Sequence, residues 1–200
     1  MGLGRFRLAL LIPIALVALS GCLSVETSVE LDEDGSGTIG LVYTIDLAAW
    51  ETGVFDDSDV SRPVPVTRNE FEAAAIQIEG LRLRSHRQER DEQTVTVRAL
   101  LAFDSVDDLR RLLGASTLHV DPESGTWRQV IAPGDGADGP EALALAESLA
   151  GYTLDFSLTA PEPVTHSNGE TDGDPRTSRF TLSLADVVVA QEEIVWEVRW

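Results

Sequence analysis

The side chains that most often carry out acid-base, nucleophilic or metal chemistry are few and scattered in this chain. No two of its histidines stand two or four residues apart, the spacing that would place them together on a strand or a helix: His86, His119 and His166. The chain has one cysteine, Cys22, and no Gly-x-Ser-x-Gly or His-Glu-x-x-His motif. Its adjacent carboxylates point apart on a regular element, whereas catalytic carboxylates must converge on one bond. The sequence therefore predicts a protein that is not an enzyme and has no cofactor.

One group of like charges departs from the acidic background. Five arginines fall within 17 residues: Arg82, Arg84, Arg87, Arg90 and Arg98. By the two-residue period of a strand, Arg82 and Arg84 share a face, and guanidinium groups suit phosphate. Arg82, Arg84 and Arg87 are therefore candidate contacts for an anionic lipid headgroup. The alternative, which the pattern favours, is a solvated sheet face on which neighbouring carboxylates balance the arginines.

A cluster of acids between two alternating segments allows a calcium loop to be considered. Asp32, Asp34 and Ser36 occupy positions 1, 3 and 5 of such a loop, but position 12 is Tyr43, where a bidentate glutamate is needed. The Asp-Gly dipeptide inside the cluster is a strong signal for a hairpin turn. We predict a plain turn and no metal site, with Asp32 and Asp34 as weak metal candidates.

Charge and composition exclude one class of partner and indicate a folded protein. The chain carries 34 acidic and 15 basic side chains, a net charge of −19, and all its basic residues are arginine. Such a charge repels phosphodiester backbones, so we expect no nucleic-acid partner. Hydrophobic residues at 43% and charged residues at 24% are ordinary for a globular protein.

The first 21 residues have the composition of a signal peptide. Arg5 and Arg7 precede an apolar run at residues 8–19, which is too short to span a bilayer. The segment Leu19-Ser20-Gly21-Cys22 is similar to the bacterial lipoprotein box, whose cysteine sulfur receives diacylglycerol before cleavage. We expect residues 1–21 to be removed and Cys22 to be lipidated. Residues 22–200 would then be a single extracytoplasmic domain, anchored to the cell membrane by its N-terminal lipid.

Removal of the leader also changes the charge of the protein. It takes away two arginines and no acid, so the net charge becomes −21. No second apolar run is long enough to span a membrane, and we expect the lipid alone to hold the protein there.

Periodicity along the rest of the chain predicts an α+β fold. Apolar and polar residues alternate in strands at 25–31, 39–45, 81–84, 94–103, 117–120, 126–131, 152–158, 178–184 and 194–200. Capping boxes at Thr67 and Ser105 and a proline at Pro140 begin three helices. We expect a mostly antiparallel sheet with two to three packed helices. The sheet should contain the hairpin at 25–45 and the strand at 194–200, with Phe71 and Ile78 packed on it.

The order of these features resembles the LppM-like bacterial lipoproteins, a family known from actinobacteria. The shared motifs are Gly21-Cys22 directly before a strand, the turn Asp34-Gly35-Ser36-Gly37, Gly80-Leu81 after the first helix, residues 103–113, and residues 160–169 before the last strands. The family's Phe-Pro-Gly-x-Val is here Ala160-Pro161-Glu162-Pro163-Val164. The resemblance implies an α+β envelope domain that binds lipid or glycolipid and has no catalytic residues.

Two hypotheses for the function follow. The first is a membrane-anchored, non-catalytic binding module for a lipid, a glycolipid or another amphiphile held between the sheet and its helices. The second is a structural or assembly lipoprotein that works through protein-protein contacts, with a solid core and a protein partner that the sequence does not identify. An enclosed apolar cavity would distinguish the first from the second.

Overall fold

The computed structural model describes residues 23–51, 65–114, 117–171 and 173–200. Its strands are β1 (Leu23–Leu31), β2 (Gly37–Asp46), β3 (Leu81–Arg90), β4 (Thr94–Phe103), β5 (Leu118–Asp121), β6 (Thr126–Ala132), β7 (Thr153–Thr159), β8 (His166–Ser167), β9 (Thr177–Ser183) and β10 (Ile194–Arg199). Its helices are α2 (Leu47–Ala49), α3 (Arg68–Gln77), α4 (Val106–Leu113), α5 (Pro140–Leu149) and α6 (Leu184–Val189). The α+β fold class is confirmed.

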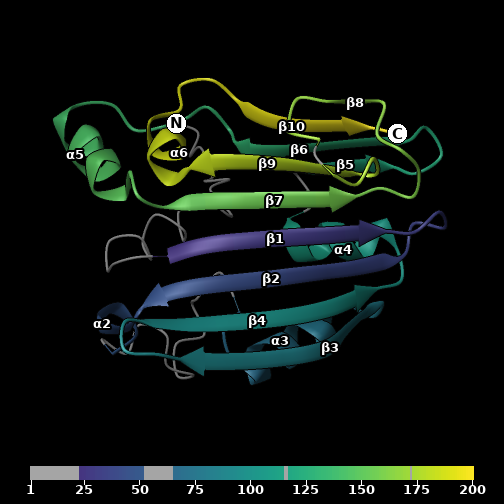
Figure 1. Cartoon of the computed structure of the whole chain (residues 1–200), viewed down its shortest axis with the longest axis horizontal. Coiled ribbons are helices and arrows are strands. Elements are labelled where there is room, and N and C mark those ends of the chain that lie inside the picture. The colour runs from purple at the N-terminus through teal and green to yellow at the C-terminus, as the bar shows by residue number, and fades with distance from the viewer. Residues whose placement is uncertain (1–22, 52–64, 115–116, 172) are drawn as a thin grey trace, which may run out of the picture.

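Six strands form the larger sheet, in the order β3-β4-β2-β1-β7-β9 (Figure 1). The predicted hairpin of β1 and β2 lies at its centre, with Val29 opposite Ile39. All neighbouring strands are antiparallel except β1 and β7, which run parallel. The sheet is therefore mostly antiparallel, as the sequence predicted.

The first two predicted helices begin at their predicted caps. The Thr67 hydroxyl accepts a hydrogen bond from the backbone of Glu70, whose carboxylate accepts one from the backbone of Thr67, so this capping box is complete. The Ser105 hydroxyl accepts from the backbone of Asp108. These bonds satisfy amide groups that the first turn of a helix leaves without partners, so the caps stabilise the start of both helices.

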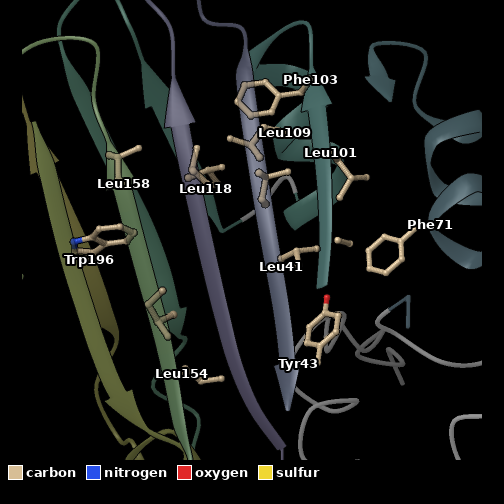
Figure 2. Close-up of a cluster of buried hydrophobic side chains, with 14 of the residues drawn as sticks. Leu41, Tyr43, Phe71, Leu101, Phe103, Leu109, Leu118, Leu154, Leu158 and Trp196 are labelled. Atoms are coloured by element: carbon tan, nitrogen blue, oxygen red, sulfur yellow. The ribbon is translucent and has the colours of Figure 1, made fainter. Parts of the chain in front are cut away.

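The core lies on one face of the six-stranded sheet. Alternation along β2 buries Ile39, Leu41, Tyr43 and Ile45 on this face. Phe71 of α3 and Leu109 of α4 are fully buried in the same cluster, which Figure 2 shows in close-up. Ile78 is half-buried and packs against it. Figure 1 looks onto the other face, with α3 and α4 behind the sheet.

The strand at the end of the chain does not join the hairpin, and this prediction was wrong. β10 belongs to a second sheet of four strands, in the order β5-β6-β10-β8. Trp196 of β10 is buried, its ring centroid lies 5.9 Å from that of Trp127 on β6, and it packs on Phe156 and Phe180 of the larger sheet. Burial of so large an aromatic surface favours packing β10 as a second layer over adding it beside β1.

Three further elements differ from the predictions. β3 continues to Arg90, beyond the predicted end at residue 84. Its second half is polar, but it pairs with β4 along its whole length. α6 occupies residues predicted to be the end of a strand and a loop, and Ser183 caps it by accepting a hydrogen bond from the backbone of Ala185. α2 is a single short turn after β2, where the sequence indicated a loop. In the ranges that the structure describes, no helix is both long and apolar enough to cross a membrane.

Candidate functional site

The second face of the six-stranded sheet carries its polar side chains in a regular grid. Residues that lie directly opposite one another on neighbouring strands form a row across the sheet, which we call a level. The level of Val42 also contains Arg98 of β4, Arg87 of β3, Glu26 of β1 and Asp155 of β7. The other levels hold mainly serine, threonine and small residues. Both sheet-packing helices, α3 and α4, lie on the opposite face. The grid is therefore a broad polar surface.

Charges on this face are separated by sign. The half formed by β3 and β4 carries Arg82, Arg87 and Arg98 with one acid, Glu89, while β1 and β7 carry Glu26, Glu30 and Asp155. Between them, β2 presents uncharged residues over most of its length. Arg179 of β9 lies on the same face at the edge beside β7. The face therefore has a basic side and an acidic side with a neutral strip between them.

Two of the three arginines predicted to contact a headgroup form ion pairs with carboxylates. Arg82 forms a two-pronged ion pair with Asp104, which keeps the pKa of that carboxyl group below its usual range, and nearby Arg84 adds to the effect. Arg87 pairs with Glu89 at 2.6 Å. The register shifts between Leu83 and Ser85, so Arg84 lies at a β-bulge, and the shift brings Arg87 to the same face as Arg82. Their role as headgroup contacts stays a prediction.

The acidic cluster between β1 and β2 forms a hydrogen-bonded turn. Asp34 accepts hydrogen bonds from the backbone and the hydroxyl of Ser36, at 3.0 and 2.6 Å, and these bonds lower its pKa. The Ser36 hydroxyl also lies 3.3 Å from the Asp32 carboxylate. Gly35 takes a positive φ of 82°, which the turn requires and glycine tolerates. No group of three or more metal-ligating side chains occurs within the described ranges.

The histidines lie apart, as their sequence spacing indicated. His86 of β3 contacts the carbonyl of Val66 at 2.9 Å and the ring of Phe71, while His119 lies 3.3 Å from Arg110. His166 pairs with Arg199 in the second sheet. Each therefore belongs to a different part of the fold.

An open cleft lies at the end of the sheet where β1 begins and β2 ends. It has a volume of about 610 Å³. Its lining is mostly polar: Ser24, Thr44, Asp46, Leu47, Ala48, Glu51, Glu92, Gln93, Thr94, Gly151 and Tyr152. Leu47 and Tyr152 add apolar surface beside three carboxylates, a combination that can contact both the ring faces and the hydroxyl groups of a polyhydroxylated molecule.

A second depression, of about 470 Å³, lies at the opposite end of the sheet. It is lined by Glu30, Leu31, Asp32, Glu33, Asp34, Thr159, Ala160, Pro161 and Arg176. Both depressions open to the surface. The interior between the layers is occupied by large side chains, among which Trp127, Trp196 and Phe103 are each 1% exposed. Within the described residues, large side chains thus fill the space between the layers.

Comparison with known proteins finds a likeness in structure but none in sequence family. No protein-family model matches the chain, and no curated protein matches it either. Among solved structures, the NMR structure of the folded domain of LppM from Mycobacterium tuberculosis is similar, with a TM-score of 0.49 and 10% sequence identity. The alignment covers 89% of this chain and 90% of that one. Membership in the family that the sequence motifs resemble stays a prediction.

Sequence reasoning missed Glu26, Asp155 and Arg98 as members of one row. The alternation of β1 and β4 indicated that Glu26 and Arg98 face away from the core. It did not indicate their level, because level depends on which strands pair and in which register. Cys22, the predicted lipidation site, lies outside the described residues.

Proposed function

We propose that this protein is a membrane-anchored, non-catalytic binding module of the cell envelope, and that its cleft beside β1 holds the uncharged sugar headgroup of a glycolipid. The observation that carries the proposal is the position of the cleft. Ser24, which lines it, is two residues from Cys22, and two residues span at most about 7 Å. A lipid on Cys22 would therefore hold the cleft at the membrane surface.

The chemistry of the lining supports a neutral polyhydroxylated ligand. Asp46 and Glu92 bring negative charge to the cleft, which opposes the phosphate of an anionic headgroup, while Glu51 is paired with Arg90. Carboxylates accept strong hydrogen bonds from hydroxyl groups, and the serine, threonine and glutamine side chains can donate or accept further ones. Tyr152 offers a ring on which a sugar can lie. A sugar therefore suits this cleft better than a phosphate does.

The arginines are less suited to a ligand in the same membrane. Arg82 lies at the level of Thr38, whereas Ser24 lies at the level of Thr44, six residues along the strand and about 20 Å away. A headgroup bound at Arg82 would thus be far above a membrane that holds Cys22. The two sites make different predictions for the same binding assay.

The test measures binding of the full-length lipoprotein, in detergent, to micelles that contain a neutral glycosyl diacylglycerol or phosphatidylglycerol. Glu92→Gln keeps the size of an exposed side chain in the cleft and removes its charge. Loss of one charge-assisted hydrogen bond should weaken binding of the glycolipid by roughly 10- to 100-fold. The matched control, Glu123→Gln in the turn between β5 and β6, should leave binding unchanged.

The result that would contradict binding of the glycolipid in the cleft is equally specific. Stronger binding of phosphatidylglycerol than of the glycolipid, abolished by Arg82→Gln with Arg84→Gln but not by Glu92→Gln, would move the site to the arginines. Absence of binding to either lipid would favour the structural or assembly role through protein contacts.

A further inference from the structure

One row of the open sheet face contains two unfavourable pairs of like charges. Arg87 lies directly opposite Arg98 across β3 and β4, with the single carboxylate of Glu89 shared between them, and Glu26 lies directly opposite Asp155 across β1 and β7. Like charges in directly opposed positions destabilise a sheet. Val42 pairs with both Arg98 and Glu26 and so separates the two pairs at the centre of the row. The row reads arginine, arginine, valine, glutamate, aspartate.

We propose that a second copy of this chain packs face to face on this sheet, related to the first by a two-fold axis that runs parallel to the strands over β2. Such an axis places the basic side of one copy over the acidic side of the other. Each residue thus faces a residue at the same level in the second copy. Arg98 then faces Glu26 of the second copy, Arg87 faces Asp155 of the second copy, and each contact occurs twice. Arg87 and Arg98 each gain a carboxylate of the second copy in addition to the Glu89 that they share, and Glu26 and Asp155 gain arginine partners.

The remaining levels accept the same arrangement. The axis brings Leu100 over Ser28 of the second copy and Ala102 over Glu30, while Glu89 meets Thr153. Thus no like charges meet at any of these levels. A two-fold axis across the strands at the level of Val42 would instead place Arg98 over Arg98 and Glu26 over Glu26. Electrostatic complementarity therefore selects one orientation.

The area of the face is sufficient for a dimer. Strands are about 4.8 Å apart and side chains on one face repeat every 6.6 Å or so, giving each position about 32 Å². Overlap of β3, β4, β2, β1 and β7 over the levels of Thr38 to Thr44 covers about 630 Å² per copy, or about 1,260 Å² in total. Stable interfaces bury about 1,200–2,000 Å².

The same axis agrees with the lipid anchor of the proposed function, on which this part of the proposal rests. An axis parallel to the strands keeps the beginning of both β1 strands at one end of the dimer. Cys22 directly precedes β1, so the lipids of both copies could enter one membrane. The axis across the strands would direct them to opposite ends.

Charge reversal tests the contacts in the full-length lipoprotein in detergent, with oligomeric state measured by analytical ultracentrifugation. Arg98→Glu and Glu26→Arg should each weaken self-association at least tenfold, because each places like charges face to face twice. Mixing the two variants should restore a heterodimer, since both of its contacts then join opposite charges. Arg179→Glu, on β9 outside the overlap, is the control and should dimerise like the unchanged protein.

Cross-linking tests the axis. Val42→Cys places a thiol on the axis, so a short bismaleimide should join two copies through it. Thr181→Cys, at the same level on β9, lies three strands from the axis and should not be joined. The unchanged chain with the same reagent reports any reaction of Cys22. A monomer in ultracentrifugation, efficient cross-linking through position 181, or failure of the mixed variants to associate would each overturn the proposal, and none of these results depends on a headgroup in the cleft.

Discussion

Arg87 and Arg98 lie directly opposite one another on β3 and β4, and the carboxylate of Glu89 pairs with both, at 2.6 Å each. One negative charge thus serves two positive ones, on a chain in which acids outnumber arginines by more than two to one. This local excess of positive charge faces solvent, and it gives the open face its basic side.

Glu89→Gln should lower the free energy of unfolding by about 1 kcal/mol or less, because it removes the carboxylate that separates two opposed arginines on an exposed face. Chemical denaturation in low and high salt measures the effect, which should shrink near 1 M salt, where the screening length is about 3 Å. An equal loss at both salt concentrations would show that the charge of Glu89 is not the cause. Glu123→Gln, in the turn between β5 and β6, is the control.

Gly80→Ala should destabilise the protein by about 1–3 kcal/mol. A Cβ atom at Gly80 would lie 2.1 Å from the Asp108 carboxylate, which is buried and 2.6 Å from the Ser105 hydroxyl. Moving that carboxylate would break this bond and disturb the start of α4. Gly151→Ala is the matched control, since nothing lies within 4 Å of its added Cβ. Similar unfolding midpoints for the two variants would contradict the expected clash.

Stability should decrease in acid. Arg82 lowers the pKa of Asp104 below its ordinary value of 3.8, so the stabilisation from this pair is complete above that value and disappears as the pH falls through the lowered pKa. Hydrogen bonds lower the pKa values of Asp91 and Asp121 in the same way. Unfolding midpoints measured from about pH 6 to pH 2 should fall less steeply for Arg82→Gln. If the unfolding midpoints of Arg82→Gln and of the unchanged protein fall equally with pH, the ion pair of Arg82 and Asp104 is not the cause.

The melting temperature should rise with added sodium chloride. A net charge of −19, or −21 after loss of the leader, implies repulsion within the fold that salt screens. Scanning calorimetry of the protein from about 0.1 M to 1 M salt measures this. A flat or falling melting temperature would mean that paired charges, such as those around Glu89, outweigh the general repulsion.

Cys22→Ser should release the protein from membranes or stall its unprocessed precursor, because this substitution removes the sulfur that would accept diacylglycerol. Membrane fractionation and the size of the chain report the two results. Unchanged membrane retention with normal processing would contradict the lipid anchor, while leaving the sheet-face contacts open to their own test.

Much of the local structure could be predicted because its causes lie within a few residues of one another. The cap of α3 depends on Thr67 and Glu70, three residues apart, and the inward face of β2 depends on simple alternation. Not every element could be predicted in this way. α6 begins at the end of a predicted strand and covers residues 185–189, where no element was predicted, because the short cap at Ser183 and packing against α5 outweigh the strand preference of its valines.

The candidate site could be predicted only in part. The arginines of β3 were found as a group from composition. Their partners were not, because Asp104 reaches Arg82 across 22 residues of sequence and the bulge at Arg84 changes the faces that follow it. The cleft joins the starts of β1 and β4, the end of β2 and the residues just before β7, so its lining depends on the order of the strands in the sheet.

From the sequence alone follow the elements that neighbouring residues specify, the burial of one face of the central strands and the acidic charge of the chain, since each depends on composition or short spacing. Tertiary structure decided that β10 lies in a second layer, that β7 runs parallel to β1, and that Arg98 and Glu26 share a level with Val42. Alternation indicates only which way a side chain faces. The neighbour and the level of each strand follow from the fit of whole packed faces, which involves residues from distant parts of the chain.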